Sequence, residues 1–480
     1  MRIDFVAILP ELVLTAAICG VLLADLVLPE DKRWLAMPLS FAGVLATLAA
    51  VLNLAGTNRV TLADMFVVDD FAVIFKVVFC VAALLVFVIS HDYLKGDDIH
   101  QGEYYVLILS SLLGMMTIAS SRDLITIFVS LELISVPAFV LAGLRKSDLK
   151  SNEAALKFFL FGVLSTAVML FGMSLIYGVT GATNLASIAT VLAAQPVSHE
   201  IAVLALFFII VGFGFKISAF PFQWWVPDTY EGAPVPIAAF LSVASKTAGF
   251  VGLLSIVFIA FGDLADVWRP FLALLAVLTM TFGNLVAIQQ KHLIRMLAYS
   301  SIGQAGYILL PLGVASATDV AVNRGAFTAS ILYLLIYAFM ETGAFAVAVV
   351  VGKKVGYLVS DYSGLNARSP ALAVAMGVFL FSLAGVPPFA GWAAKFFVFK
   401  AVIDGGGGWL AAIMAVNTVI ALFYYAAVVK RMFFETSADL KPVTLTPLLG
   451  TAVALTAAVV LVIGVLPDLF GKVAGYSTLF

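Results

Sequence analysis

Three lysines lie inside long apolar segments, where an ammonium group would be buried. Lys216 and Lys246 lie in a proline-rich stretch that runs from 212 to 250, and Lys395 follows two adjacent prolines in LAGVPPFAGWAAKFFVFK. Proline breaks a helix, and a broken helix at membrane depth survives only where protein or water satisfies the freed backbone groups. Charged residues inside a membrane are costly and mark by default a path for ions or protons. The pattern predicts a buried proton relay; a purely structural role for the lysines is the alternative.

A carboxylate in another apolar segment could complete this relay. Glu132 lies in the middle of SLELISVPAF, and a carboxylate at that depth must be protonated, paired or hydrated. We interpret it as the partner that keeps Lys216 charged, since a nearby carboxylate favours the charged form of a lysine. Moving Glu132 closer or farther would then load or unload Lys216. A structural hydrogen bond between helices is the alternative.

Other charged residues are secondary candidates. Lys157 follows Glu153 by four residues, a spacing that favours a local ion pair on one helix face, although a relay step is also open. Glu341, in YAFMETGAF, could hold Lys395, accept protons itself or be structural. Lys400 is expected to reach toward the outer surface, and Lys76 has no assigned role. A polar stripe in LAYSSIGQAGY could order water or bond neighbouring helices: Tyr299, Ser300, Ser301, Gln304 and Tyr307.

The composition predicts the fold class. The chain has 480 residues, of which 63% are hydrophobic and only 11% charged, whereas about a quarter of a soluble protein is charged. Apolar runs of about 20 residues indicate membrane-spanning helices rather than barrel strands. We therefore predict an all-α polytopic membrane protein. The net charge of −2 gives no basic face for nucleic acid.

No cofactor site is visible in the chain. The two cysteines, Cys19 and Cys80, lie far apart in apolar runs, so we expect core residues rather than ligands of a zinc ion or an iron–sulfur cluster. Neither GxGxxG nor GxxxxGK[ST] occurs, so no dinucleotide or nucleoside-triphosphate motif is present. We expect neither a cofactor nor a metal ion in this chain.

The apolar runs predict about fourteen spans. The first, rather than a signal peptide, begins at the N-terminus, and the short segment 184–195 is expected to lie at the membrane surface. The predicted spans are 4–28, 34–54, 67–90, 103–120, 123–144, 153–178, 201–226, 232–260, 268–288, 293–313, 326–351, 371–403, 408–431 and 446–466.

Loop charges predict the orientation of the chain. Loops after odd-numbered spans carry more lysines and arginines than the others, and such loops face the cytoplasm. Both termini are therefore expected outside, in the inner membrane of a bacterial cell.

Two spans are proline-interrupted, at 201–226 and 371–403. Broken spans at matching places in two halves indicate an inverted repeat with its functional site at the midplane. Spans four to eight and nine to thirteen would form two five-helix repeats of opposite topology. The predicted parts are an N-terminal three-helix segment, a first repeat, a second repeat and a C-terminal helix, at 1–90, 103–260, 268–431 and 446–480.

Several motifs together resemble the antiporter-like membrane subunits of respiratory complex I. They are LELISVPAF around Glu132, EAALKFFLFG around Lys157, FKISAFPFQWWVPDTYEGAPVPIAAFLSVASKTAGF around Lys216 and Lys246, IRMLAYSSIGQAGY, and GVPPFAGWAAKFFVF around Lys395. The resemblance covers nearly the whole chain. A lysine at 395 favours the member that has a lysine there over a sister subunit that has an acid.

The resemblance implies a proton-pumping unit of an NADH:quinone oxidoreductase, a translocase with no redox centre in this chain. FMN, iron–sulfur clusters and quinone would be bound by partner subunits, among them antiporter-like sister subunits. Glu132 and Lys216 would lie near the cytoplasmic half-channel, Lys246 would be the central relay and Lys395 the outward donor. The alternatives are a subunit of a multisubunit cation/proton antiporter or membrane-bound hydrogenase, and a scaffold that only bridges subunits.

Overall fold

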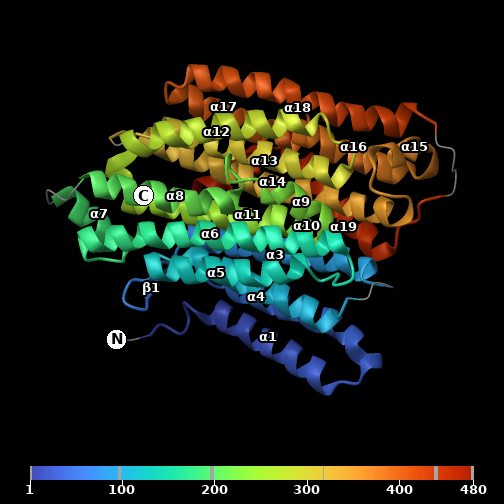
Figure 1. Cartoon of the computed structure of the whole chain (residues 1–480), viewed down its shortest axis with the longest axis horizontal. Coiled ribbons are helices and arrows are strands. Elements are labelled where there is room, and N and C mark those ends of the chain that lie inside the picture. The colour runs from blue at the N-terminus through green and yellow to red at the C-terminus, as the bar shows by residue number, and fades with distance from the viewer. Residues whose placement is uncertain (1–2, 96–98, 195–198, 317, 437–441, 477–480) are drawn as a thin grey trace.

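The computed structural model describes residues 3–95, 99–194, 199–316, 318–436 and 442–476. Its helices lie side by side as a bundle, with the first helices of the chain toward one edge and α17 and α18 toward the other (Figure 1). Helix α1 lies at one edge and α18 at the opposite edge, whereas α19 returns to pack against α14 in the middle. The first two and last four residues of the predicted terminal segments lie outside the described residues.

The first half of the chain contains α1 (Leu9–Val27), α2 (Ala36–Leu52), α3 (Asp70–Tyr93), α4 (Gln101–Ser120), α5 (Leu124–Ala142), α6 (Leu149–Thr180), α7 (Leu185–Ala194), α8 (His199–Ile217), α9 (Trp225–Gly232), α10 (Val235–Phe240) and α11 (Lys246–Ser255). The second half contains α12 (Ala265–Ala287), α13 (Leu293–Leu309), α14 (Val320–Lys354), α15 (Leu365–Arg368), α16 (Pro370–Ala384), α17 (Ala390–Asp404), α18 (Gly408–Phe434), α19 (Pro447–Val465) and α20 (Asp468–Tyr476). The 3₁₀ turns are η1 (Glu30–Leu35), η4 (Gly262–Leu264), η5 (Leu310–Val314) and η6 (Val359–Tyr362), and the π-helical turns are η2 (Leu241–Ser245) and η3 (Ile256–Ala260).

The predicted fold class is confirmed. Within the described residues, eleven helical segments are long and apolar enough to cross a membrane, and shorter apolar helices accompany them. Each predicted span overlaps a helix or a broken pair of helices, and the short segment 184–195 forms α7. The position of α7 at the membrane surface stays a prediction. The long runs form helices because a helix satisfies its own backbone hydrogen bonds, which a membrane interior requires.

Two details differ from the sequence-based expectations. A small antiparallel hairpin joins α2 to α3, with strands β1 (Arg59–Thr61) and β2 (Phe66–Val68). Its residues are too few to show a strand pattern against the adjoining apolar runs. Cys80 is buried as expected, but Cys19 is exposed because α1 lies at the edge of the bundle (Figure 1) and is the least buried of the candidate spans.

Both predicted helix breaks are present. Helix α8 ends at Ile217 and the next helix begins only at Trp225, while α16 ends at Ala384 and the next begins at Ala390. Gly385 terminates α16 in the left-handed region, with a φ of 88°, a conformation that costs glycine little. The carbonyls at the ends of α8 and α16 therefore lack helical partners.

The centre of the bundle is formed by the two most deeply buried of the candidate membrane spans. Helix α14 and the segment Val235–Ala260, which contains α10 and α11, are almost wholly buried. A helix that is apolar all round belongs in an interior rather than at a surface. Charged residues on these two elements are therefore enclosed by protein.

Candidate functional site

Lys216 lies in the last turn of α8, directly before the first break. It is 4% exposed, and its ammonium group donates a hydrogen bond of 2.9 Å to the Ser135 hydroxyl on α5. Glu132 lies one turn earlier on α5, half-buried, and its charge acts on Lys216. In the described part of the chain, however, no hydrogen bond or ion pair joins the two. Lys216 therefore contacts a neutral acceptor and has the predicted carboxylate nearby.

A glycine makes room for the stem of Lys216. A Cβ atom at Gly249 on α11 would lie 2.9 Å from Lys216 Cγ, closer than real side chains approach. The absent side chain lets α8 and α11 pack with the lysine stem between them. Since Gly249 follows Lys246 by three residues, about one helical turn, this packing also brings two of the predicted relay lysines into adjacent turns.

Lys246 begins α11, immediately after the π-helical turn η2, and is 1% exposed. Its ammonium group donates to the Ser301 carbonyl at 2.8 Å and to the Ser301 hydroxyl at 2.9 Å. The fully buried Glu341 of α14 accepts a hydrogen bond of 3.0 Å from Ser242, and its charge and that of Lys246 act on each other. The charge of Glu341 thus acts on Lys246 rather than on Lys395, and this partner was not foreseen.

Lys395 lies in α17, just beyond the second break, and is 6% exposed. It donates a hydrogen bond of 2.8 Å to the Ala384 carbonyl at the end of α16. Its ammonium nitrogen also lies 4.4 Å from the centre of the Tyr307 ring, a cation–π distance. The lysine therefore satisfies one of the carbonyl groups that the helix break frees.

The polar stripe of α13 contacts both of the last two lysines. Ser301 binds Lys246 at one end of the stripe. One turn on, the Gln304 amide donates to the Leu383 carbonyl at 3.1 Å, next to the carbonyl that Lys395 binds. Gln304 also accepts from Tyr333 and donates to Tyr425. Two of the side chains foreseen as ordering water or joining helices thus make buried hydrogen bonds, Ser301 with Lys246 and Gln304 beside the second break. Among the described residues, no hydrogen bond joins these two side chains to each other.

Two acids near the first break, Asp228 and Glu231, have no role that the sequence alone predicts. Asp228, on α9, accepts from Lys157 of α6 at 2.6 Å and from Arg295 of α13 at 2.7 Å. Burial raises the pKa of Asp228, but the hydrogen bonds from Lys157 and Arg295 outweigh it and hold that pKa below its usual value. Lys157 also forms the predicted local pair with Glu153, at 2.6 Å.

The second acid extends this network. Glu231 accepts from Lys150 at 2.9 Å and from Arg295 at 3.0 Å. A small cavity of about 150 Å³ is lined by charged side chains of this network and by Ala154 and Gly232. Both acids stand in the motif WVPDTYEGAP, so the charges could be seen, but their partners on α6 and α13 could not.

Two further lysines, Lys76 and Lys400, lie apart from these contacts. The buried Lys76 forms an ion pair of 2.6 Å with Glu11, which joins α3 to α1; the sequence offered no partner because the acid lies in another apolar run. Lys400 is 63% exposed at its side chain and lies 3.9 Å from Asp404, in agreement with the expected surface position.

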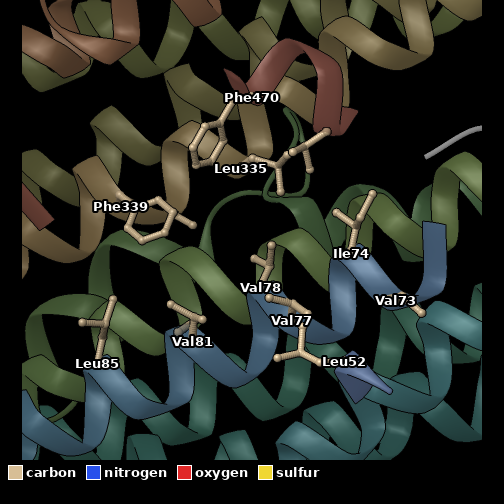
Figure 2. A pocket seen from close by; sticks show the side chains of 13 residues that line it. Leu52, Val73, Ile74, Val77, Val78, Val81, Leu85, Leu335, Phe339 and Phe470 are labelled. Carbon is tan, nitrogen blue, oxygen red and sulfur yellow. The ribbon is translucent and has the colours of Figure 1, made fainter. Parts of the chain in front are cut away.

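A separate cavity of about 350 Å³ lies between α3, α14 and α20 (Figure 2). Its lining is apolar, with Val77 and Val81 on one side and Phe339 and Phe470 on the other. No side chain in this lining can bind or release a proton, so the cavity does not belong to the relay.

Comparisons with known proteins agree on the family. A family of transmembrane regions described as NADH:quinone oxidoreductase/Mrp antiporter matches residues 121–421. NADH-quinone oxidoreductase subunit N from Trichlorobacter lovleyi is 41% identical over 97% of this chain and 95% of its own length. A chain of respiratory complex I from Thermus thermophilus with bound aureothin is 29% identical, with a TM-score of 0.80 over 96% of this chain and 98% of that one. A chain of the Mrp complex from a Dietzia species, with a TM-score of 0.84 over 99% and 97%, is 20% identical and shares the fold alone.

Proposed function

Because the chain belongs to the NADH:quinone oxidoreductase/Mrp antiporter family of membrane proteins, we propose that it translocates protons as the subunit-N component of an NADH-quinone oxidoreductase. The observation that carries this proposal is the burial of three lysines inside the bundle, each bound to protein oxygen atoms and none facing lipid. Charges are kept at such depth where they serve an ion or proton path. A scaffold has no reason to bear that cost.

The proposed path runs from Lys216, with Glu132 nearby, through Lys246 to Lys395. Lys216 and Lys246 occupy adjacent packed turns, and α13 places Ser301 at Lys246 and Gln304 at the second break. Glu341 is proposed as the acid that tunes Lys246. Its hydrogen bond from Ser242 keeps the carboxylate in place beside that lysine.

Lys157 is proposed as a secondary residue at the cytoplasmic side. Its two ion pairs, with Glu153 and Asp228, support an electrostatic role beside the first break rather than a free proton carrier. Protons would reach Lys216 from this side and leave from Lys395 toward the outside.

The chain is proposed to work without a redox group of its own. FMN, iron–sulfur clusters and quinone would be bound by partner subunits, and electron transfer there would drive the proton steps here. Other membrane subunits, including antiporter-like sisters, are its partners. The alternative hypothesis, a subunit of a cation/proton antiporter, is less supported, because the similarity to the Mrp chain is one of fold alone.

The test replaces Lys216 or Glu132 with alanine in the assembled complex. We expect proton uptake by membrane vesicles during NADH oxidation to fall at least about tenfold for Lys216→Ala, since a positioned proton-transfer group is worth about 10²–10⁴ in rate. Proton uptake should fall less for Glu132→Ala, because that carboxylate only favours the charged form of Lys216. Assembly is checked by copurification of flavin and iron–sulfur subunits.

Normal pumping by assembled Lys216→Ala would reject the relay. Copurification of the chain with no flavin or iron–sulfur subunit, together with cation/proton exchange in vesicles, would instead support the antiporter.

A further inference from the structure

We propose that Ser135 is a positioning residue that holds Lys216 away from Glu132 between proton transfers. The inference rests on the proposed function and concerns how the first lysine is switched. It follows from the partner that Lys216 actually has, which is the Ser135 hydroxyl at 2.9 Å, although a carboxylate lies one turn away on the same helix.

The Ser135 hydroxyl is oriented as an acceptor. Its own proton is donated to the Leu131 carbonyl at 2.7 Å, and a hydroxyl has a single proton and two lone pairs. A lone pair is therefore what Lys216 meets. Both the charged and the neutral amine of a lysine can donate to a lone pair, whereas a carboxylate attracts the charged form much more strongly. Ser135 can thus hold the side chain after the proton has left.

The two alternative partners are within reach of one lysine. Glu132 and Ser135 are three residues apart on α5, so their side chains lie on the same face about 5–6 Å from each other. The long, flexible lysine side chain can move between them by rotamer changes. Pro137, two residues beyond Ser135, lacks the backbone donor for the Leu133 carbonyl, which makes this turn of α5 easier to deform.

The neighbouring residues of α11 and α6 do not compete with Ser135 and Glu132 for Lys216. Helix α11 contributes Gly249, which has no side chain, and Lys246, which repels a second positive charge and is itself bound to Ser301. The nearest basic residue of α6, Lys157, is engaged by its own acids. In this scheme, Lys216 takes up its proton while it is paired with Glu132. When it is bound to Ser135, it can pass that proton on toward Lys246.

The experiment compares Ser135→Ala with Ser130→Ala in the assembled complex. Ser130 is a matched control: it is buried on the same helix, 3% exposed, and its hydroxyl bonds only to the carbonyl of Thr126, at 2.6 Å. Loss of a hydrogen bond to a charged group should lower proton uptake about tenfold in Ser135→Ala. Ser130→Ala should stay near the unmodified rate, and Ser135→Thr, which keeps the hydroxyl, should restore pumping.

Equal pumping by Ser135→Ala and Ser130→Ala would overturn the proposal, as would a failure of Ser135→Thr to exceed Ser135→Ala. If Ser135→Ala does not assemble, Ser135→Cys is measured instead, since a thiol keeps the size but accepts hydrogen bonds weakly. Full pumping by that variant would also overturn the proposal. Lys216→Ala is measured alongside: if it pumps normally the proposed function fails, whereas if it alone is inactive only the role of Ser135 fails.

Discussion

At the scale of single residues, the three lysines of the proposed relay share an unexpected feature, because each donates to an uncharged oxygen. The acceptors are a serine hydroxyl for Lys216, a serine hydroxyl and carbonyl for Lys246, and a helix-end carbonyl for Lys395. A buried charge held by a close carboxylate is hard to discharge, since separating the pair leaves an uncompensated charge. Neutral acceptors hold the amine in place without trapping its proton, which suits a relay.

The last lysine of the path can be tested against a neighbour on the same helix. Lys395→Gln should lower proton uptake during NADH oxidation at least about tenfold, because it removes the ionisable group that is bound to the Ala384 carbonyl at the second break. Lys400→Gln is the control, since Lys400 is exposed and lies 3.9 Å from an exposed acid; it should retain pumping. Equal loss in both variants would mean that positive charge on α17, rather than proton transfer at Lys395, is what matters.

At the scale of elements, the first break is braced by ion pairs on both sides. The short helix α9 is tied to α6 through Lys157 and to α13 through Arg295, and both bonds meet at Asp228. A broken helix needs such ties because the backbone groups at the break no longer hydrogen-bond within the helix. An ion pair also joins helices at the edge of the bundle, where Glu11 and Lys76 tie α1 to α3.

Asp228→Asn should therefore loosen the bundle at the first break. Removing the charge leaves Lys157 and Arg295 without their shared partner, at a cost of about 1–3 kcal/mol in stability. Because the folded-state pKa of Asp228 lies below its usual value, its contribution is complete above the unfolded pKa of about 3.9 and is lost as pH falls through the lower folded value.

Thermal unfolding of the assembled complex tests this prediction. The midpoint for Asp228→Asn should lie below that of the unmodified complex at every pH from neutral to about 5. Asp404→Asn, which changes an exposed acid, should leave the midpoint nearly unchanged. An equal shift in both variants would contradict a specific brace at α9.

At the scale of the whole molecule, the helix order and the two breaks favour two five-helix units related by opposite topology, and this division stays a prediction. The units are not separate bodies: α9 of the first is ion-paired to α13 of the second, and Lys246 of the first binds Ser301 of the second. A proton path that crosses from one unit to the other requires such a shared interior.

The orientation of the chain is predicted to place both termini outside. Single cysteines at the exposed Lys472 and Lys146 would test it in a background that lacks Cys19 and Cys80. An impermeant maleimide added to intact spheroplasts should label Lys472→Cys, whereas Lys146→Cys should react only after permeabilisation, because basic loops stay in the cytoplasm. The reverse pattern would show that the loop charges were misread.

By itself, the sequence determined the helical membrane fold, the two broken spans and which lysines are buried. These are properties of local composition: a long apolar run must become a helix in a membrane, and a lysine within it is costly wherever the helix lies. The resemblance of whole motifs also identified the family, which the comparisons confirm.

Only the tertiary structure decided which groups meet. Lys216 meets Ser135 across 81 residues of chain, Glu341 stands beside Lys246 rather than Lys395, and Lys76 finds Glu11. Hydropathy tells how deep a side chain lies, but not which neighbour it faces. That choice depends on how helices distant in sequence rotate and pack against one another, as where Gly249 lets α11 close over the stem of Lys216.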